Sequence, residues 1–308
     1  MRFPSLAGND NLKRAFSKEH FLDSGAIILS GPDGSGKRTA ARDIAMGLLC
    51  TGSPAPCGSC GACIRMKAGS HPDYELLNNE GAEIKVDMVR ALRARSFIRP
   101  SEARCKVFVL CAADKMNVQS QNALLKVLEE PASTVFILLC ENSESLLPTV
   151  RSRSMHYRLE PLKEELLVRL LSQRFPAADS RQLQEAAAAS GGFLGTAIAA
   201  LSGDESESVR LARQFIAALG RDELSVLTCC MELSRLSRED YALFCDVLCR
   251  QLLHSVRCSM ENPGDLLTLY EYVEEQKAKT AFNASVTALS GALAAFCGEN
   301  LKLSWRKQ

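Results

Sequence analysis

Two kinds of hydrophobic pattern alternate along the first 160 residues of the chain. Short runs of consecutive apolar residues, bounded by turn signals, are typical of strands buried in a parallel sheet. Segments in which apolar residues recur every three or four positions are typical of helices that cover such a sheet. The sequence therefore predicts an α/β domain over residues 1–160 with a parallel five-stranded sheet. The predicted strands are Ala26–Leu29, Tyr74–Leu77, Lys106–Leu110, Val135–Leu139 and Met155–Leu159, with helices between them through Leu48 and at Val86–Arg95 and Gln121–Glu130.

After Pro161 the strand pattern stops and only helical periodicity remains. Three short helices are predicted over residues 161–203, and they would form a small helical lid. The polar, turn-rich stretch Ser202–Ser208 is the best candidate for a linker. Residues 208–308 are predicted to form an all-α C-terminal domain, with helices at about 209–219, 222–236, 239–258, 263–276 and 280–297.

Length and charge narrow the classes of protein that remain. The chain has 308 residues and a formal net charge of +1, and 46% of its residues are hydrophobic. A single core rarely grows past about 250–300 residues, so more than one domain is expected. The composition excludes a disordered chain, a collagen and a globally basic nucleic-acid coat. The residues after Met1 lack the apolar core of a signal peptide, and no stretch is apolar all round, so we expect a cytoplasmic protein without a membrane segment.

A glycine-rich loop follows the first predicted strand and opens the first helix. Its sequence, Gly-Pro-Asp-Gly-Ser-Gly-Lys from Gly31 to Lys37, matches a P-loop, in which backbone N–H groups and the lysine cradle phosphates. The candidate nucleotide-binding residues are the glycines and the lysine of this motif: Gly31, Gly34, Gly36 and Lys37. The next residue of a P-loop normally offers Mg²⁺ a hydroxyl, but here it is Arg38. Thr39 comes one residue later, about 100° further round the helix, and so points elsewhere.

The carboxylates of a hydrolysing P-loop enzyme are also missing. Such an enzyme holds the Mg²⁺ shell with an acidic residue at the end of a neighbouring strand. After the strand Lys106–Leu110 the two expected positions are Cys111 and Ala112, and Asp114 is displaced by three residues from the first. The sequence therefore predicts a degenerate P-loop that hydrolyses ATP very poorly, while binding of ATP or ADP without turnover stays open.

Four of the thirteen cysteines fall within fourteen residues, in the spacing C-x₆-C-x₂-C-x₂-C. This spacing matches a tetrahedral zinc site, and four thiolates leave no open position for catalysis. The sequence therefore predicts a structural Zn²⁺ held by Cys50, Cys57, Cys60 and Cys63. The alternative is a group of buried or redox-active cysteines without a metal.

Several motifs follow one another in an order that resembles the clamp-loader branch of the AAA+ ATPases. After the P-loop and the four cysteines come His71-Pro72-Asp73, then Asn-Ala-Leu-Leu-Lys-Val-Leu-Glu-Glu-Pro at 122–131, and then Ser152-Arg153-Ser154. The resemblance is specific over about residues 1–200. It implies an AAA+ P-loop domain, and it implies that residues 208–308 form an oligomerisation collar in a hetero-pentameric ring. It further implies motor and clamp-opening subunits as partners, and a sliding clamp that the complex loads onto primed DNA.

The same resemblance assigns a role to Arg153. In the family, a Ser-Arg-Cys triplet lies at a subunit interface, and its arginine reaches the nucleotide of the neighbouring motor subunit. Here the third residue is Ser154, but the arginine is present. A family arginine on the third lid helix, which senses nucleotide, is replaced by Gly195. Together these features imply a non-hydrolysing structural subunit of the DNA polymerase clamp loader, which supplies Arg153 in trans.

Two other functions remain open at this point. The chain could be an active P-loop ATPase, like the motor subunits, with an atypical magnesium site that uses Thr39 or Asp114. It could also be a zinc-module protein that binds nucleic acid alone. Against the second, the cysteine loop has only Arg65 and Lys67 nearby and no aromatic residue on which a base could stack. The plain alternative for Arg153 is a surface salt bridge.

Overall fold

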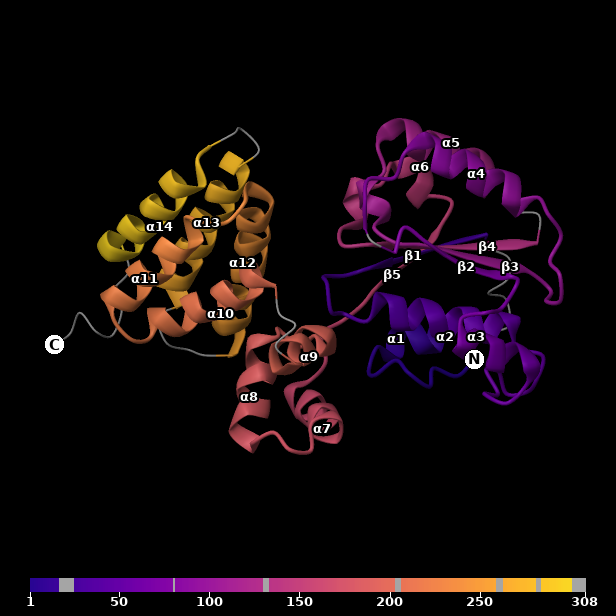
Figure 1. Cartoon of the computed structure of the whole chain (residues 1–308), viewed down its shortest axis with the longest axis horizontal. Coiled ribbons are helices and arrows are strands. Elements are labelled where there is room, and N and C mark those ends of the chain that lie inside the picture. Colours follow the sequence, from indigo (N-terminus) through magenta and orange to yellow (C-terminus); the bar gives the residue numbers. More distant parts are fainter. Residues whose placement is uncertain are drawn as a thin grey trace. The chain divides into compact units, whose positions relative to one another are not determined.

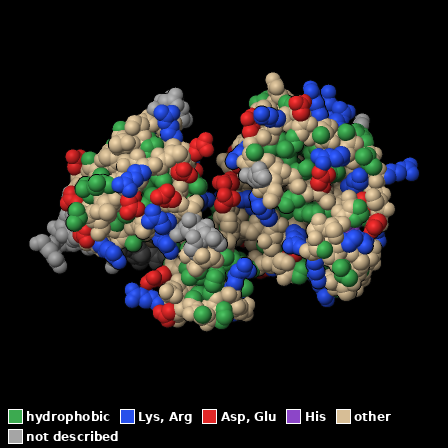
Figure 2. Space-filling view, in the orientation of Figure 1, with side chains coloured by type: hydrophobic (Ala, Val, Ile, Leu, Met, Phe, Trp, Pro, Cys, Tyr) green, Lys and Arg blue, Asp and Glu red, His purple; other side chains and the backbone are tan. Residues whose placement is uncertain are grey.

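The computed structural model describes residues 1–16, 25–79, 81–129, 133–202, 206–258, 263–280 and 284–300. The chain divides into two compact units, Met1–Leu162 and Lys163–Gln308 (Figure 1). Lys and Arg side chains are interspersed with Asp and Glu side chains on the face shown in Figure 2, as the net charge of +1 suggests. Among the described residues, no helix combines the length and the apolar character that crossing a bilayer requires.

The first unit is built on a parallel five-stranded sheet with the strand order β2-β3-β4-β1-β5. Its strands are β1 (Ala26–Ser30), β2 (Tyr74–Leu77), β3 (Lys106–Leu110), β4 (Thr134–Cys140) and β5 (Met155–Arg158). Every residue of β1 and β4 is buried, which explains why both strands appear in the sequence as unbroken apolar runs. The five predicted strands are confirmed.

Helices cover both faces of this sheet (Figure 1). One face carries α1 (Asp10–Ala15), α2 (Lys37–Leu49) and α3 (Gly61–Ala68), and the other carries α4 (Val86–Ser96), α5 (Val118–Leu128) and α6 (Pro148–Arg151). Two short 3₁₀ helices, η2 (Ala113–Lys115) and η3 (Ser143–Ser145), follow β3 and β4. Alternate residues of β1 serve the two layers: Ile27 packs in the core with α2, and Ile28 packs in the core with α4 and α5.

The helix of the Asn122–Pro131 motif begins earlier than the sequence pattern predicts. Asn117 caps it, since its Oδ1 accepts a hydrogen bond from the backbone N of Ser120 at 2.9 Å. Asparagine is a strong N-cap residue, so α5 starts at Val118 and not at Gln121. The apolar periodicity begins only one turn later, and this is why it misplaced the start. The last residues of the motif, 130–131, lie outside the described part of the chain.

The second unit is entirely helical in its described residues. Its first three helices are α7 (Glu164–Arg174), α8 (Ser180–Ala189) and α9 (Leu194–Ser202). They are followed by α10 (Glu207–Leu219), α11 (Glu223–Leu233), α12 (Arg238–Cys258), α13 (Pro263–Thr280) and α14 (Val286–Asn300). One core joins α10 to α14, with Phe244 of α12 against the rings of Phe215 and Tyr241. The predicted α/β domain on a parallel five-stranded sheet, followed by a helical part of the chain, is confirmed.

Candidate functional site

The phosphate loop leaves the sheet at its centre, between β1 and α2. β1 lies between β4 and β5, and the backbone N–H of Gly31 donates to the carbonyl of Cys140 at the end of β4 (N–O distance 3.2 Å). Gly34 and Gly36 have φ angles of 75° and 93°, which side-chain-bearing residues rarely adopt. Within the described residues no side chain caps α2, and its first turn contains no acidic residue. The N–H groups of this helix end therefore remain available to an anion.

The lysine of the loop is held by the loop itself. Lys37 Nζ donates to the carbonyl oxygens of Gly31 at 2.6 Å and Pro32 at 2.9 Å, and it lies 3.6 Å from a carboxylate oxygen of Asp33. The Lys37 side chain is only 12% exposed, whereas that of Asp33 is 80% exposed. The positive charge that would meet a phosphate is thus already in place at the centre of the loop.

An arginine lies where a magnesium site would be expected. The guanidinium of Arg38 donates to the carbonyl oxygen of Asn79 at 2.7 Å, and its positive charge is close enough to Cys111 to act on the pKa of that thiol. Cys111 follows β3 and is buried, and this burial raises the pKa of its thiol although Arg38 and Lys37 act in the opposite direction. The thiol is therefore neutral at pH 7, and with Ala112 beside it neither expected position offers a carboxylate.

The alternative magnesium groups join no cluster of three or more metal-ligating His, Cys, Asp or Glu side chains among the described residues. Asp114 lies in η2, where its Oδ2 accepts a hydrogen bond from the backbone N of Glu141 at 3.1 Å. Thr39 is half-buried, one residue beyond Arg38 on α2. The structure therefore gives the active-ATPase alternative no assembled metal site among the described residues.

The sequence analysis did not place Cys140 and His156 beside the loop. Cys140, at the end of β4, is paired with Ser30 of β1, the residue before the loop. His156 of β5 shares a hydrogen bond of 2.8 Å between its Nε2 and Ser30 Oγ. Burial lowers the pKa of His156, with Arg151 acting in the same direction, so the ring is neutral at pH 7. The chain order of the strands does not reveal which of them flank β1, so nothing in the sequence pattern pointed to these neighbours.

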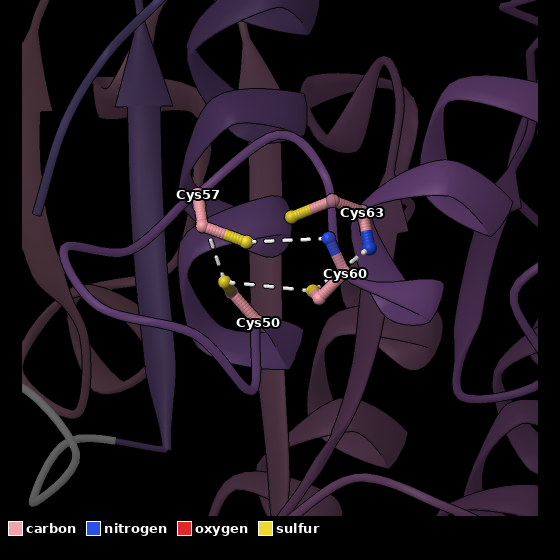
Figure 3. Close-up of side chains that lie close together, drawn as sticks. All are labelled: Cys50, Cys57, Cys60 and Cys63. Carbon is pink, nitrogen blue, oxygen red and sulfur yellow. Dashed lines mark hydrogen bonds between the residues drawn. The ribbon is translucent and has the colours of Figure 1, made fainter.

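The four cysteines come together at the end of α2 (Figure 3). All four Sγ atoms lie within 4.8 Å of one another, and those of Cys50 and Cys60 are 3.8 Å apart. Zinc–sulfur bonds of about 2.3 Å in a tetrahedron place sulfurs roughly 3.8 Å apart. Cys50 ends α2, Cys60 caps α3 and Cys63 lies inside α3, so two helix ends fix three of the four ligands.

Backbone donors point at the sulfur atoms of this cluster. Cys50 Sγ accepts from the backbone N of Gly52 and of Cys57, each at 3.3 Å, and Cys57 Sγ accepts from the N of Cys60 at 3.3 Å. The N–H of Cys63 lowers the pKa of Cys60 to about 5, and the N–H groups of Ser59 and Cys60 lower the pKa of Cys57. Burial raises the pKa of Cys63 to about 12. Thiolates are the form that binds zinc, and the cluster suits Zn²⁺ in distance and in donor chemistry.

The His71-Pro72-Asp73 motif supports the same region. Asp73 accepts hydrogen bonds from three successive backbone N–H groups, those of Ser101 at 2.6 Å and of Glu102 and Ala103 at 2.9 Å each. Burial raises the pKa of Asp73, but these three bonds outweigh it and the pKa is lowered overall. The loop held in this way carries Glu102, which forms an ion pair with Arg65 of α3.

Arg153 lies between α6 and β5, at the surface of the first unit. Its side chain is 41% exposed, and it forms an ion pair of 3.0 Å with Glu129, the residue that follows α5. One Arg153 Nη also donates to the carbonyl oxygen of Thr149 at 3.2 Å. The pair joins two motifs that carry the clamp-loader resemblance, the 122–131 segment and the Ser152-Arg153-Ser154 triplet. Gly195, in the first turn of α9, has no side chain to offer.

Comparison with known proteins agrees with these motifs. Residues 8–163 match the family described as DNA polymerase III, delta subunit. The delta-prime subunit of Pseudomonas aeruginosa DNA polymerase III is 40% identical over 172 residues, which are 54% of this chain and 52% of that protein. The gamma/tau subunit of Mycobacterium tuberculosis is 34% identical over 189 residues, 58% of this chain and 32% of that protein. The chain thus matches about half the length of its delta-prime relative and a third of its gamma/tau relative.

A solved structure is similar along most of the chain. The DNA polymerase III gamma subunit-related protein of Thermotoga maritima covers 94% of this chain, and 98% of that chain is covered, with a TM-score of 0.48 and 20% identity. The clamp-loader resemblance of the sequence motifs is confirmed by the family match and the delta-prime relative. Since the matched residues make up half of its length, the chain belongs to the DNA polymerase III delta-subunit family.

Proposed function

We propose that the chain is a non-hydrolysing subunit of a DNA polymerase clamp loader, which helps to load the sliding clamp onto primed DNA. Its partners would be the motor subunits and the clamp-opening subunit of a hetero-pentamer, and the helices α10–α14 would form its part of the collar. Family membership and the delta-prime relative support this proposal.

The observation that carries the proposal is an asymmetry between two places on the first unit. At the phosphate loop, Arg38 and the neutral thiol of Cys111 stand where a hydrolysing enzyme needs a hydroxyl and a carboxylate. A nucleotide bound there without turnover is compatible with this role. At the surface, by contrast, Arg153 is retained and exposed although the chain's own site has no use for it.

We infer that Arg153 serves the nucleotide of a neighbouring motor subunit. Both side chains of its ion pair with Glu129 are about half exposed, and such surface pairs contribute only about 0–1 kcal/mol to the free energy of unfolding. Exchanging Glu129 for a phosphate oxygen therefore costs little. A guanidinium delivered in trans stabilises the charge of the transferring phosphoryl group.

We also infer that Cys50, Cys57, Cys60 and Cys63 hold one structural Zn²⁺. The bound ion would cross-link the end of α2, the turn-rich loop and α3. Four thiolates on Zn²⁺ carry a net charge near −2, which Lys67 partly offsets from the same module, where its Nζ donates to the carbonyl oxygen of Gly58 at 2.7 Å.

Reconstitution with the motor and clamp-opening subunits tests the role in the complex. We expect the chain to co-purify with them, and Arg153→Ala to keep assembly while lowering clamp-stimulated ATPase and clamp loading. The loss should be smaller than the roughly 10³–10⁵-fold effect of a lone trans arginine, because a ring has several sites. Arg153→Lys should rescue only partly, since a point charge cannot replace the planar fork.

The matched control is Arg90→Ala, which removes an exposed arginine that also pairs with a carboxylate, that of Asp87 at 3.4 Å. Wild-type loading rates in complexes that carry Arg153→Ala would show that the arginine has no trans role. Failure to co-purify would refute the subunit assignment itself. Magnesium-dependent ATPase of the isolated chain that disappears in Lys37→Ala would establish the active-ATPase alternative.

A further inference from the structure

We propose that the segment Leu301–Gln308, which directly follows α14, turns back and binds in a groove between α11 and α14. The segment would then cover an apolar surface of the second unit with residues of the same chain. The proposal concerns the second unit alone, and it depends neither on the nucleotide site nor on the zinc cluster nor on the clamp-loader role.

The groove lies where α11 packs beside α14 (Figure 1). Its volume is about 610 Å³, which is within the usual range of sites that take a ligand. A Cβ added to Gly291 would meet no atom within 4 Å, so the α14 side of the groove is open. Small residues make up that side, and two large apolar residues line the α11 side: Gly291, Ala294, Ala295 and Gly298 on α14, and Leu227 and Met231 on α11.

α11 is apolar on two sides, and within the described residues only one of them is covered. Val226 and Cys230 are buried in the core that joins α10 to α14. Leu224, Leu227 and Met231, in contrast, are 73%, 47% and 65% exposed. Their spacing of three and four residues puts them on one stripe of the helix. Large apolar side chains gathered on one exposed stripe mark a surface that a binding partner covers.

One end of the groove is acidic, and the segment begins there. Glu223 and Glu299 both line the groove, and a Cβ added to Gly298 would lie 3.3 Å from Glu223 Oε1. The last turn of α14 contains no basic residue that would offset the negative end of the helix dipole. α14 ends at Asn300, so Leu301 leaves the helix at this acidic end.

The composition and length of Leu301–Gln308 fit the groove. Three of its eight residues are Lys or Arg and none is Asp or Glu, so its charge is opposite to that of the acidic end. Leu301, Leu303 and Trp305 alternate with polar residues, which puts them on one side of an extended chain. Eight extended residues span about 26 Å, whereas the helical stretch from Thr287 to Gly298 spans about 16 Å. The segment is therefore long enough to turn and follow the whole groove.

Tryptophan fluorescence of the full chain tests the proposal, because Trp305 is the only tryptophan of the sequence. The synthetic peptide Leu301–Gln308 is the solvent-exposed reference. We expect the emission of the full chain to be blue-shifted from that of the peptide and less quenched by acrylamide. Met231→Lys, which places a charge in the groove, should move both readings toward those of the peptide. Leu267→Lys is the matched control and should change neither, because Leu267 is 42% exposed on α13 and lies outside the groove.

Binding of the same peptide to a chain that ends at Asn300 gives a second measurement. A short tether creates an effective concentration on the order of 1 mM, so a dissociation constant below about 1 mM suffices for the tethered segment to occupy the groove. Met231→Lys should weaken peptide binding about tenfold or more, since an apolar contact is lost. Glu223→Gln combined with Glu299→Gln should weaken it too and reduce its dependence on salt.

Three results would overturn the proposal. The first is a folded full chain in which Trp305 emits and is quenched like the free peptide. The second is a blue shift that Met231→Lys leaves unchanged, because Trp305 would then be buried elsewhere. The third is a blue shift that disappears on dilution, because the segment would then occupy the groove of a second copy of the chain. Co-purification with the motor subunits decides the clamp-loader role separately.

Discussion

Replacing one cysteine ligand at a time separates two contributions to the stability of the first unit: that of the bound metal and that of side-chain packing. Cys57 is only half-buried, whereas Cys63 has no exposed surface and belongs to the hydrophobic core beneath α2. We therefore expect Cys57→Ser to lose zinc while the metal-free protein keeps its stability. Cys63→Ser should lose zinc and also destabilise the metal-free protein, because a hydroxyl buried without a partner costs about 1–3 kcal/mol.

The size of the zinc effect follows from mass action. Free zinc at a thousand times its dissociation constant adds about 4 kcal/mol to the free energy of unfolding. For a unit the size of Met1–Leu162, each kcal/mol shifts the melting temperature by about 2–4 °C, so the shift should be about 8–16 °C. Both serine variants should lose this shift, and only Cys63→Ser should melt below the metal-free wild type.

The assay combines elemental analysis of protein purified without chelator with thermal denaturation in zinc and in excess chelator. Cys105→Ser is the control, because Cys105 is buried in the same core and does not belong to the cluster. Wild type without zinc, or Cys57→Ser with one zinc per chain, would refute the tetrahedral site. Equal stability of the two metal-free variants would refute the packing role of Cys63.

Two more predictions concern stability. Asp73→Ala leaves three backbone N–H groups without their acceptor, and we expect the first unit to lose about 3 kcal/mol at pH 7 in a urea titration. The folded pKa of Asp73 is lowered, so its contribution is present above the unfolded value of about 3.9 and disappears as the pH falls through the folded pKa. The difference from wild type should therefore shrink as the pH falls through that range, and a difference that stays constant would contradict this account. Leu248→Ala, in the core of the second unit, should cost about 2–5 kcal/mol there and leave the zinc content unchanged; altered zinc binding would contradict the separation of the two cores.

The sequence predicted the elements of the fold well because their signals are local. β1 and β4 are buried on both faces, so continuous apolar runs identified them, and the cysteine spacing identified four thiols that the fold brings within 4.8 Å of one another. The start of α5 was misplaced because a capping asparagine sets it and not the apolar repeat.

The surroundings of the candidate site could not be predicted in this way. The bond between Ser30 and His156 joins residues 126 positions apart and depends on the strand order. The hydrogen bond between Arg38 and the carbonyl oxygen of Asn79 likewise joins residues 41 positions apart and depends on how α2 lies against the sheet. Sequence spacing showed that the phosphate loop lacks the hydroxyl and the carboxylate of a magnesium site. Only the fold shows which side chains surround the loop instead.

The contacts of α2 limit how the two ends of this helix can move relative to the rest of the first unit. It begins at the phosphate loop with Lys37 and ends at Leu49, directly before Cys50, so its thirteen residues span about 20 Å between the two sites. Cys50 ties its far end into the cysteine cluster, and Arg42, midway along, is bound to the carbonyls of Met66 and Lys67 on α3. Because its far end and its middle are both bound to the cysteine module, we expect α2 and that module to move as one rigid body.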